Sequence, residues 1–267
     1  MATNVSQPSG TWAWTPANLS ALTVYVDGDN LPSLDTYVST WSALYGSGSF
    51  GQTGYSGRPY RVNIGAIPSA QFTASGSDML TGQMGDNSAQ GFSAGVLCYS
   101  DTAQDWKDAI SLTYGFDPAS SEVARIETGG GSTTMYSGVG VTTPGVSGTL
   151  NTSSWIFASM RGGGSTGGTS LHRNGVFSMA ANYSSTTIWN RCILGANYLY
   201  SRHMQVAITA AWCATTDIGV ENIMKLEGWI ARKYSLTGNL STSHWNKTIP
   251  PFTKRILFSS EAFSSVA

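Results

Sequence analysis

Hydrophobic residues along this chain occur mainly in short runs, and turns rich in glycine, serine and threonine separate these runs. Many side chains in the runs are β-branched or aromatic, which is typical of strands. The dipeptide Asn174-Gly175, between two such runs, is the strongest short signal of a β-hairpin. Strands are predicted over residues 22–27, 38–44, 58–64, 70–74, 91–99, 109–116, 123–127, 133–136, 139–141, 155–161, 170–173, 176–179, 188–194 and 204–212. This spacing predicts a sandwich or barrel of antiparallel sheets, with a glycine-rich loop over 46–57.

One segment near the C-terminus has the period of a helix instead. Its apolar residues recur at steps of three and four and therefore share one face; they are Val220, Ile223, Leu226, Ile230 and Tyr234. We expect a helix over 217–234, capped by Thr216 or Asp217, with Arg232 and Lys233 near its negative end. A lone amphipathic helix must pack its apolar stripe on a partner, and the predicted sheet is the only surface available.

Domain organisation follows from the absence of any repeat, linker or break in composition. The sequence predicts a flexible N-terminal arm over residues 1–11, one β-sandwich with its helix over 12–250, and a C-terminal tail over 251–267. Chains of this length are long enough to bury a large core without disulfide staples.

The composition narrows the class of partner. Only 11% of the 267 residues are charged, against about a quarter in ordinary domains, and the net charge is −1. This balance gives no electrostatic field for nucleic acid. It suits a chain covered by neighbours, or an extracellular or virion surface. The longest apolar run, ending near Ala214, is about half of a membrane span, so no membrane partner is expected.

Two further features concern the compartment. Cys98, Cys192 and Cys213 stand in apolar surroundings, which predicts buried free thiols. The first ten residues show neither the basic nor the apolar region of a signal peptide. We therefore expect synthesis and folding in a cytoplasm.

Several segments resemble a known family over almost the whole chain. The clearest is the closing pattern Leu226-Glu-Gly-Trp-Ile-Ala-Arg-Lys-Tyr-Ser-Leu236; Leu22-Thr-Val-Tyr-Val-Asp27-Gly-Asp29, Thr40-Trp41-Ser42 and Arg58-Pro59 accompany it. In these segments the chain resembles the concanavalin A-like, laminin-G-like jelly rolls of phage structural proteins and large bacterial surface proteins. The resemblance implies an all-β, antiparallel jelly-roll sandwich with one C-terminal α-helix packed on it. The acidic stretch that family members often carry before the helix is replaced by residues 201–208, which lack a carboxylate.

Candidate chemistry is sparse. Asp27 and Asp29 form the only acidic pair at strand spacing, and we expect solvated turn residues there rather than a catalytic dyad. The two carboxylates are weak candidates for one Ca²⁺, because an EF-hand loop is excluded by Pro32 and Val38 at positions that need glycine and glutamate. The three histidines lack the paired spacing of a zinc site. Asp108 is expected in an exposed loop beside Trp106. No catalytic residue and no cofactor are predicted.

Recognition by a surface is the remaining possibility. The densest cluster of aromatic and polar residues comprises Asn197, Tyr198, Tyr200, Arg202 and His203, and Trp106 is predicted in another loop. Aromatic rings beside such polar groups can bind sugars, because rings stack on C–H faces while hydroxyls take hydrogen bonds. The same rings can instead fill loop cores or a protein interface. Both interpretations stay open.

Two classes of function result. The first is a non-enzymatic virion structural protein, most simply a capsid decoration protein assembled in the host cytoplasm and displayed on the virion surface. Its partners would be major capsid or tail subunits, within a homo-oligomer or a symmetric assembly. The alternative is a glycan-binding head of a tail fibre or baseplate, or a stand-alone lectin-like module that binds host glycans. A glycosidase with an unrecognised site is a third and weaker option.

Overall fold

A computed structural model describes residues 14–52, 57–87, 91–102, 104, 106–114, 122–129, 134–139, 153–163, 168–182, 189–196 and 202–251. Three of the predicted contact residues, Asn197, Tyr198 and Tyr200, lie outside these ranges, as do the predicted N-terminal arm and all but the first residue of the tail.

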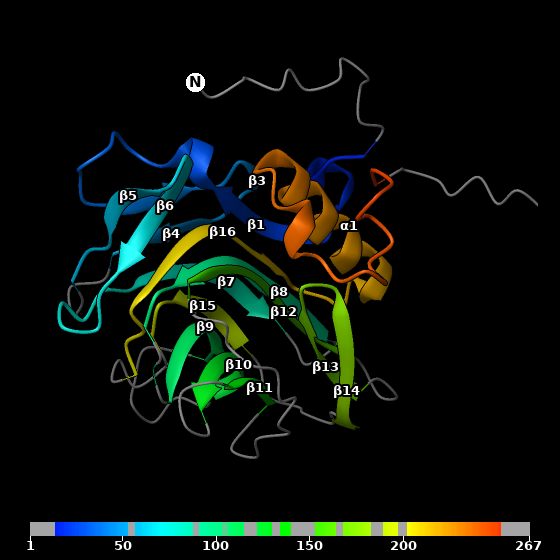
Figure 1. Ribbon diagram of the computed structural model, residues 1–267. Coiled ribbons are helices and arrows are strands. Elements are labelled where there is room, and N and C mark those ends of the chain that lie inside the picture. The colour runs from blue at the N-terminus through cyan, green and yellow to red at the C-terminus, as the bar shows by residue number, and fades with distance from the viewer. Residues whose placement is uncertain are drawn as a thin grey trace, which may run out of the picture.

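Two antiparallel sheets form a sandwich (Figure 1). The nine-stranded sheet has the order β14 (Val176–Asn182), β13 (Gly168–Arg173), β12 (Ser154–Gly163), β8 (Gly91–Ser100), β16 (Val206–Ala214), β1 (Leu22–Asp27) and β3 (Tyr45–Gly46), with β6 (Ile67–Phe72) paired to β16 and β5 (Tyr60–Ile64) paired to β6. The seven-stranded sheet has the order β11 (Thr134–Val139), β10 (Glu122–Gly129), β9 (Lys107–Thr113), β15 (Trp189–Leu194), β7 (Leu80–Asn87), β4 (Ser49–Gly51) and β2 (Thr40–Ser42). The predicted all-β sandwich is confirmed.

The helix α1 (Gly219–Lys233) forms a third layer on the outer side of the nine-stranded sheet, opposite the seven-stranded one (Figure 1). The 3₁₀ turns η1 (Pro16–Asn18) and η2 (Gly28–Asn30) flank β1, and η3 (Thr237–Asn239) follows α1. The apolar stripe is confirmed where Ile223, Leu226 and Ile230 are buried. None of the helices in the described ranges is long and apolar enough to cross a membrane.

Two large clusters of buried hydrophobic residues lie between the layers in the described part of the chain. One lies between the sheets and includes Trp41, Phe50 and Phe72. The second lies between the nine-stranded sheet and α1, where Trp212 meets Leu226 and its neighbours. Strand β16 contributes to both cores and is buried at every residue. Its two buried faces explain why residues 204–213 read as one continuous apolar run instead of an alternating one.

The Asn174-Gly175 hairpin is confirmed, because it joins β13 to β14. Both residues have a positive φ, 49° and 79°, as a two-residue turn between twisted strands requires. The turn also has a tertiary role. A side chain at Gly175 would meet His244 at 2.1 Å, so only glycine lets the C-terminal segment pack on the hairpin.

Some local predictions were wrong. The predicted loop over 46–57 contains β4, because Phe50 is buried opposite Trp41. Strand 38–44 shortens to β2. The helix begins at Gly219, whose φ of 76° prevents an earlier regular turn, and the cap position is Ile218 rather than Thr216 or Asp217. The Asp217 carboxylate nevertheless accepts a 2.8 Å hydrogen bond from the Gly219 N–H.

All three cysteines are buried and free, as predicted. Burial raises the pKa of the Cys98 thiol to about 12, because a thiolate would lose its hydration in the core. The thiols therefore serve as packing groups.

Candidate functional site

The outer face of the seven-stranded sheet carries charged side chains that the sheet positions in pairs. In β9 and β10, Ile110 and Ile126 face the core between the sheets. The register shifts by one residue next to this pair, so that Asp108 stands opposite Glu127. A bulge of this kind re-aims a side chain. Asp108 in β9 and Glu127 in β10 are both fully buried, and Arg125, also in β10, is 9% exposed.

Two arginines neutralise these carboxylates. Arg125 Nε lies 2.9 Å from Glu127 Oε1 and 3.8 Å from Asp108 Oδ1. Arg202, from the segment before β16, donates from Nη1 to Glu127 Oε2 at 2.9 Å. Glu127 is thus held between two guanidinium groups. Because a buried charge is tolerated only when it is paired, each member of this network depends on the others.

Trp106 stands beside this network, immediately before β9. Its side chain is 45% exposed, and its backbone has a φ of 52°, a left-handed conformation that costs free energy in a residue with a side chain. The guanidinium carbon of Arg202 lies 5.9 Å from the centroid of the indole ring. Gln104 ties the same turn to the start of β16, since its amide donates to the Gln205 carbonyl at 2.6 Å and accepts from the Gln205 N–H at 2.5 Å.

His203 is the other member of the predicted cluster that the structure describes, and its side chain is buried instead of exposed to a ligand. It is 7% exposed and bridges Asp108 through the backbone, where the Asp108 N–H donates to the Arg202 carbonyl at 3.2 Å. The structure therefore brings together Trp106, Arg202 and His203. We call Trp106, Arg202 and the buried Glu127 the Trp106 corner.

Sequence reasoning missed the buried part of this site. Asp108 was expected in an exposed loop and is instead fully buried in β9. Arg125 and Glu127 were predicted in a strand without a role. The available signal was their spacing, because charges at alternate positions of a strand point to the same face.

The Trp106 corner offers an exposed ring and a guanidinium group that is fixed by its buried partner. Arg202 keeps 38% of its side chain exposed, while its Nη1 donates to the buried Glu127. The two carboxylates are enclosed and paired. The arrangement suits recognition of a polar ligand better than transfer of a proton.

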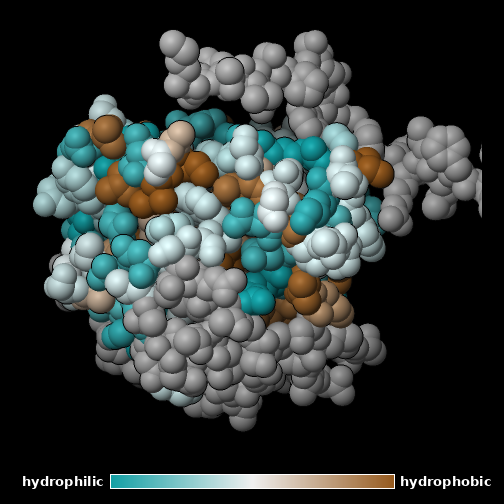
Figure 2. All heavy atoms as spheres, in the orientation of Figure 1, coloured by the Kyte–Doolittle hydropathy of each residue, from teal (hydrophilic) through white to brown (hydrophobic). Residues whose placement is uncertain are grey.

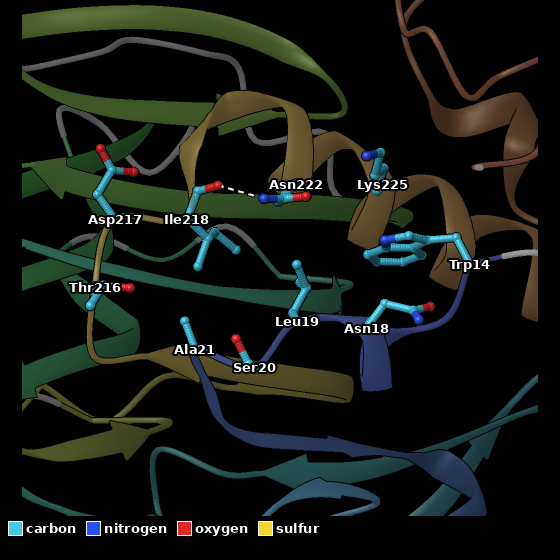
Figure 3. Close-up of a pocket in the computed structure, with 10 residues that line it drawn as sticks. All are labelled: Trp14, Asn18, Leu19, Ser20, Ala21, Thr216, Asp217, Ile218, Asn222 and Lys225. Atoms are coloured by element: carbon cyan, nitrogen blue, oxygen red, sulfur yellow. Dashed lines mark hydrogen bonds between the residues drawn. The ribbon is translucent and has the colours of Figure 1, made fainter. Parts of the chain in front are cut away.

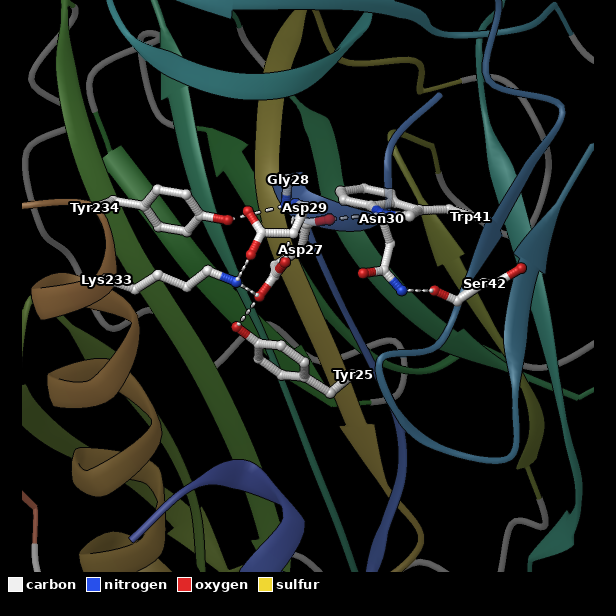
Figure 4. Close-up of polar contacts among 9 residues, drawn as sticks. All are labelled: Tyr25, Asp27, Gly28, Asp29, Asn30, Trp41, Ser42, Lys233 and Tyr234. Carbon is white, nitrogen blue, oxygen red and sulfur yellow. Dashed lines mark hydrogen bonds and ion pairs between the residues drawn. The ribbon is translucent and has the colours of Figure 1, made fainter. Parts of the chain in front are cut away.

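Asp27 and Asp29, the weak metal candidates, share a lysine (Figure 4). Lys233 Nζ, at the end of α1, lies 2.6 Å from Asp27 Oδ2 and 2.6 Å from Asp29 Oδ2. Asp27 also accepts a 2.9 Å hydrogen bond from the Tyr25 hydroxyl and is fully buried, so it is not the solvated turn residue expected. An ammonium group thus occupies the space between the carboxylates. Among the residues that the structure describes, no three His, Cys, Asp or Glu side chains group as metal ligands.

A second buried carboxylate lies beneath α1. Glu227 Oε1 accepts a 2.9 Å hydrogen bond from Ser159 Oγ, and Glu227 Oε2 lies 3.4 Å from His244 Nε2. The Asn246 N–H donates to His244 Nδ1 at 3.0 Å, which places the proton of neutral His244 on Nε2, toward Glu227. His172 is close enough for Glu227 to influence it, yet burial lowers the pKa of His172. This cluster ties helix, sheet and C-terminal segment together and is closed to ligands.

Exposed hydrophobic surface is also found outside the Trp106 corner. Figure 2 shows it over β5 and β6, whereas the surface over α1 is mixed. Tyr37 forms a bridge to Tyr60 of β5 and is 58% exposed, and Leu34 is 48% exposed. The Tyr37 ring already contacts Arg58, whose guanidinium carbon is 4.8 Å from the centroid, and Tyr60, at 5.2 Å between centroids.

Comparison with known proteins gives a fold but no family. No family model matches the chain, and no curated protein matches it. Among solved structures it is similar to a Trypanosoma rangeli sialidase in complex with sialic acid, with a TM-score of 0.52 and 10% identity over 80% of this chain and 33% of the sialidase. It is also similar to domain 4 of AbnA, a GH43 extracellular arabinanase from Geobacillus stearothermophilus, in complex with arabinotriose. There the TM-score is 0.52 and the identity 15%, over 77% of this chain and 98% of that domain.

A third similar structure is the receptor-binding domain of botulinum neurotoxin type G, with a TM-score of 0.54 and 8% identity over 79% of this chain and 51% of that one. The chain spans a third of the length of the sialidases it matches. At such identities the likeness concerns the fold alone. It supports the predicted lectin-like β-sandwich, and the phage context stays a prediction.

Proposed function

We propose that this protein is a non-catalytic, lectin-like domain that binds a glycan at the Trp106 corner. The observation that carries the proposal is the half-exposed indole of Trp106, held in a left-handed backbone beside an arginine that a buried glutamate fixes. Strained residues that the surrounding structure holds in place tend to cluster at functional sites. A domain of the same fold in AbnA, in complex with arabinotriose, supports the choice of ligand class.

The chemistry of the corner matches a sugar. The indole ring offers a flat apolar face for the C–H groups of a pyranose or furanose, and Arg202 offers N–H donors for its hydroxyl oxygens. Glu127 holds Arg202 in place before the ligand arrives, so little side-chain entropy is lost on binding. Arg202 and Glu127 neutralise each other, which favours a neutral sugar over a strongly charged one.

A glycosidase is the less favoured option. Glycoside hydrolysis needs two carboxyl groups that flank the scissile bond with access to it. Asp108 and Glu127 are fully buried, and an arginine lies within 3.8 Å of one and 2.9 Å of the other. Neither can reach a substrate without breaking the network. We therefore expect binding without turnover.

The test compares two tryptophans of equal exposure on a glycan array. Trp106 is 45% exposed and Trp245 is 46% exposed, on a segment that follows α1. We expect the wild type and Trp245→Ala to bind the same glycans, and Trp106→Ala to lose binding by roughly tenfold or more, because stacking on an aromatic ring supplies much of the affinity. Equal binding by Trp106→Ala, or no binding of any glycan by the wild type, would overturn the proposal.

Incubation with the bound glycan and with laminarin-type and alginate-type polysaccharides supplies the second measurement. New reducing ends produced by the wild type would revive the glycosidase option. If no new reducing ends form while the glycan binds, the result supports a domain that binds the glycan without cleaving it.

A role on the surface of a virus particle is the second candidate. It is favoured by the hydrophobic surface over β5 and β6 and by the low share of charged residues, 11%, which suits a chain covered by neighbours. In this role the contact surface would meet capsid or tail subunits, while the Trp106 corner remains available to a host glycan.

This role is tested by attachment to particles. We expect the isolated protein to bind particles that lack it, and Leu34→Asp with Tyr37→Asp to reduce its occupancy, because charges placed in an apolar contact must be desolvated. Deletion of residues 1–11 is expected to weaken attachment while leaving the fold intact. A protein that never joins particles, but binds glycans, would remove the particle role and leave the glycan proposal standing.

A further inference from the structure

A pocket of about 410 Å³ opens at the start of α1 (Figure 3). Three elements form it: the segment that carries η1 and enters β1, the end of β16, and the first turns of α1. The residues that line it are Trp14, Asn18, Leu19, Ser20, Ala21, Thr216, Asp217, Ile218, Asn222 and Lys225. Its size lies within the range of small-molecule sites, roughly 300–1,000 Å³.

We propose that this pocket is a second binding site and that it takes a neutral, hydroxyl-rich ligand, namely a single sugar residue. The proposal does not depend on the Trp106 corner, because the two sites share no residue. It depends on which lining groups are already paired and which are not.

The charged groups of the pocket are paired within the protein. Both oxygens of Asp217 accept from Arg161, with Nε at 2.8 Å, and Asp217 Oδ1 also accepts from the Gly219 N–H. Lys225 Nζ lies 2.8 Å from Glu221 Oε1. A charged ligand would therefore have to displace an existing ion pair to gain a partner. The acidic side chain at the helix start also satisfies the positive end of α1, which disfavours an anion there.

The uncharged polar groups of the pocket keep hydrogen-bonding capacity that the described part of the chain does not use. The hydroxyls of Ser20 and Thr216 are exposed and make no hydrogen bond to the described part of the chain. Asn18 uses its Oδ1 to accept from the Thr15 N–H at 2.7 Å, which leaves its amide N–H groups. Asn222 uses its Nδ2 to donate to the Ile218 carbonyl at 2.9 Å, which leaves its Oδ1. The pocket thus offers donors, acceptors and two hydroxyls, the mixed set that a ring of sugar hydroxyls can match.

Apolar side chains supply the rest of the surface. Figure 3 shows Leu19 and Ile218 between the two rows of polar groups, with the Trp14 ring at one end near Lys225. Trp14 is only 2% exposed, so it acts as a wall and not as an open stacking platform. A few convergent polar groups around an apolar floor is the usual composition of a small-ligand site. Two sugar sites that share no residue would let one molecule bridge two glycan chains and gain avidity.

The experiment is an NMR titration of the ¹⁵N-labelled protein with methyl α-glucoside, methyl α-mannoside, methyl β-galactoside and N-acetylglucosamine, each up to high millimolar concentration. We expect at least one of these sugars to cause saturable shifts at the amides of residues 216–225 and at the Trp14 indole N–H. Thr216→Trp, which fills the pocket from an exposed position, should weaken this binding by roughly tenfold or more, because it occupies the ligand volume. Ser20→Trp provides a second pocket-filling variant.

The matched control is Thr40→Trp, a threonine-to-tryptophan change at an exposed position of β2, which should bind as the wild type does. Trp106→Ala should also retain these shifts, so a failure of the glycan proposal at the Trp106 corner is distinguished from a failure here. The inference is overturned if none of the four sugars shifts the amides of 216–225, or if both pocket-filling variants, folded by their spectra, bind as well as the control.

Discussion

The two outer faces of this sandwich use the same physical device for different ends. On the nine-stranded sheet, α1 closes the face with a second hydrophobic core, and buried polar contacts at Glu227 and at Asp27 attach the helix. On the seven-stranded sheet, the buried Glu127 pairs with Arg125 and with Arg202, which remains partly exposed beside Trp106. In one case the buried carboxylate holds an element of the fold, and in the other it holds a surface group.

This contrast indicates which face of the sandwich carries function. A buried ion pair contributes little net stability compared with apolar packing of the same volume. Its presence is therefore explained best by what it positions. Under α1 every group of the cluster is enclosed, whereas the network on the other face ends at an exposed guanidinium and an exposed ring.

The largest effect is expected from breaking the network of the seven-stranded face. Arg125→Met removes the cation that lies between two fully buried carboxylates, and it should lower the free energy of unfolding by about 3–5 kcal/mol, because one of the two guanidinium groups that offset these buried charges is lost. Urea denaturation measures this loss. Lys225→Met, in the more exposed pair with Glu221 on α1, is the control and should cost no more than about 0.5 kcal/mol. Equal small losses in both variants would contradict the assigned role of the network.

The second effect concerns the apolar attachment of α1. Leu226→Ala opens a cavity in the core beneath the helix and should cost about 2–5 kcal/mol. Leu44→Ala, at a residue that is 39% exposed, should stay within about 0.5 kcal/mol of the wild type. If both substitutions had the same effect in thermal or urea unfolding, α1 would not be sealing this face.

The pH dependence of stability reports on the buried cluster beneath α1, because His172 lies in it. Burial lowers the pKa of His172 from 6.5, with Glu227 opposing the shift and Arg161 adding to it. The unfolded chain then takes up the proton first as the pH falls, so stability is lost from about pH 6.5 downward until the folded pKa is reached. We expect His172→Asn to reduce the pH dependence of the unfolding free energy in this window. An unchanged slope would show that another group causes it.

The smallest effect tests the strain at the Trp106 corner. Trp106→Ala and Trp106→Gly both remove the ring, but only alanine keeps a Cβ at a φ of 52°. Glycine should therefore give the more stable variant by about 1 kcal/mol. Unfolding curves of the two variants give this difference directly. An alanine variant as stable as the glycine one would mean that the turn relaxes and carries no strain.

Much of the fold could be predicted from local patterns. The β-branched runs, the Asn174-Gly175 turn and the apolar stripe of 220–234 each report on neighbours within a few residues, and the structure places strands or the helix there. The prediction failed where burial came from a distant partner. Phe50 forms a strand inside a glycine-rich segment because it packs in the core opposite Trp41, which no local pattern records.

The candidate site divides in the same way. Its exposed members, Trp106 and Arg202, were predicted because aromatic and basic residues in loops stand out in a sequence. Asp108 and Glu127 were missed, because a carboxylate in a strand looks the same whether it faces water or a buried arginine. The pocket at the start of α1 was missed as well, since segments far apart in the chain line it.

The amino-acid order alone was sufficient for the β-rich class, the position of the helix and the poverty in charge, because hydrophobic period and composition are properties of short stretches of chain. Only the folded molecule decided which charges meet. Glu127 and Arg202 are 75 residues apart, and Lys233 and Asp27 are 206 apart. Sheet register and helix docking bring these groups within hydrogen-bond distance, and such long-range geometry depends on the packing of the whole core.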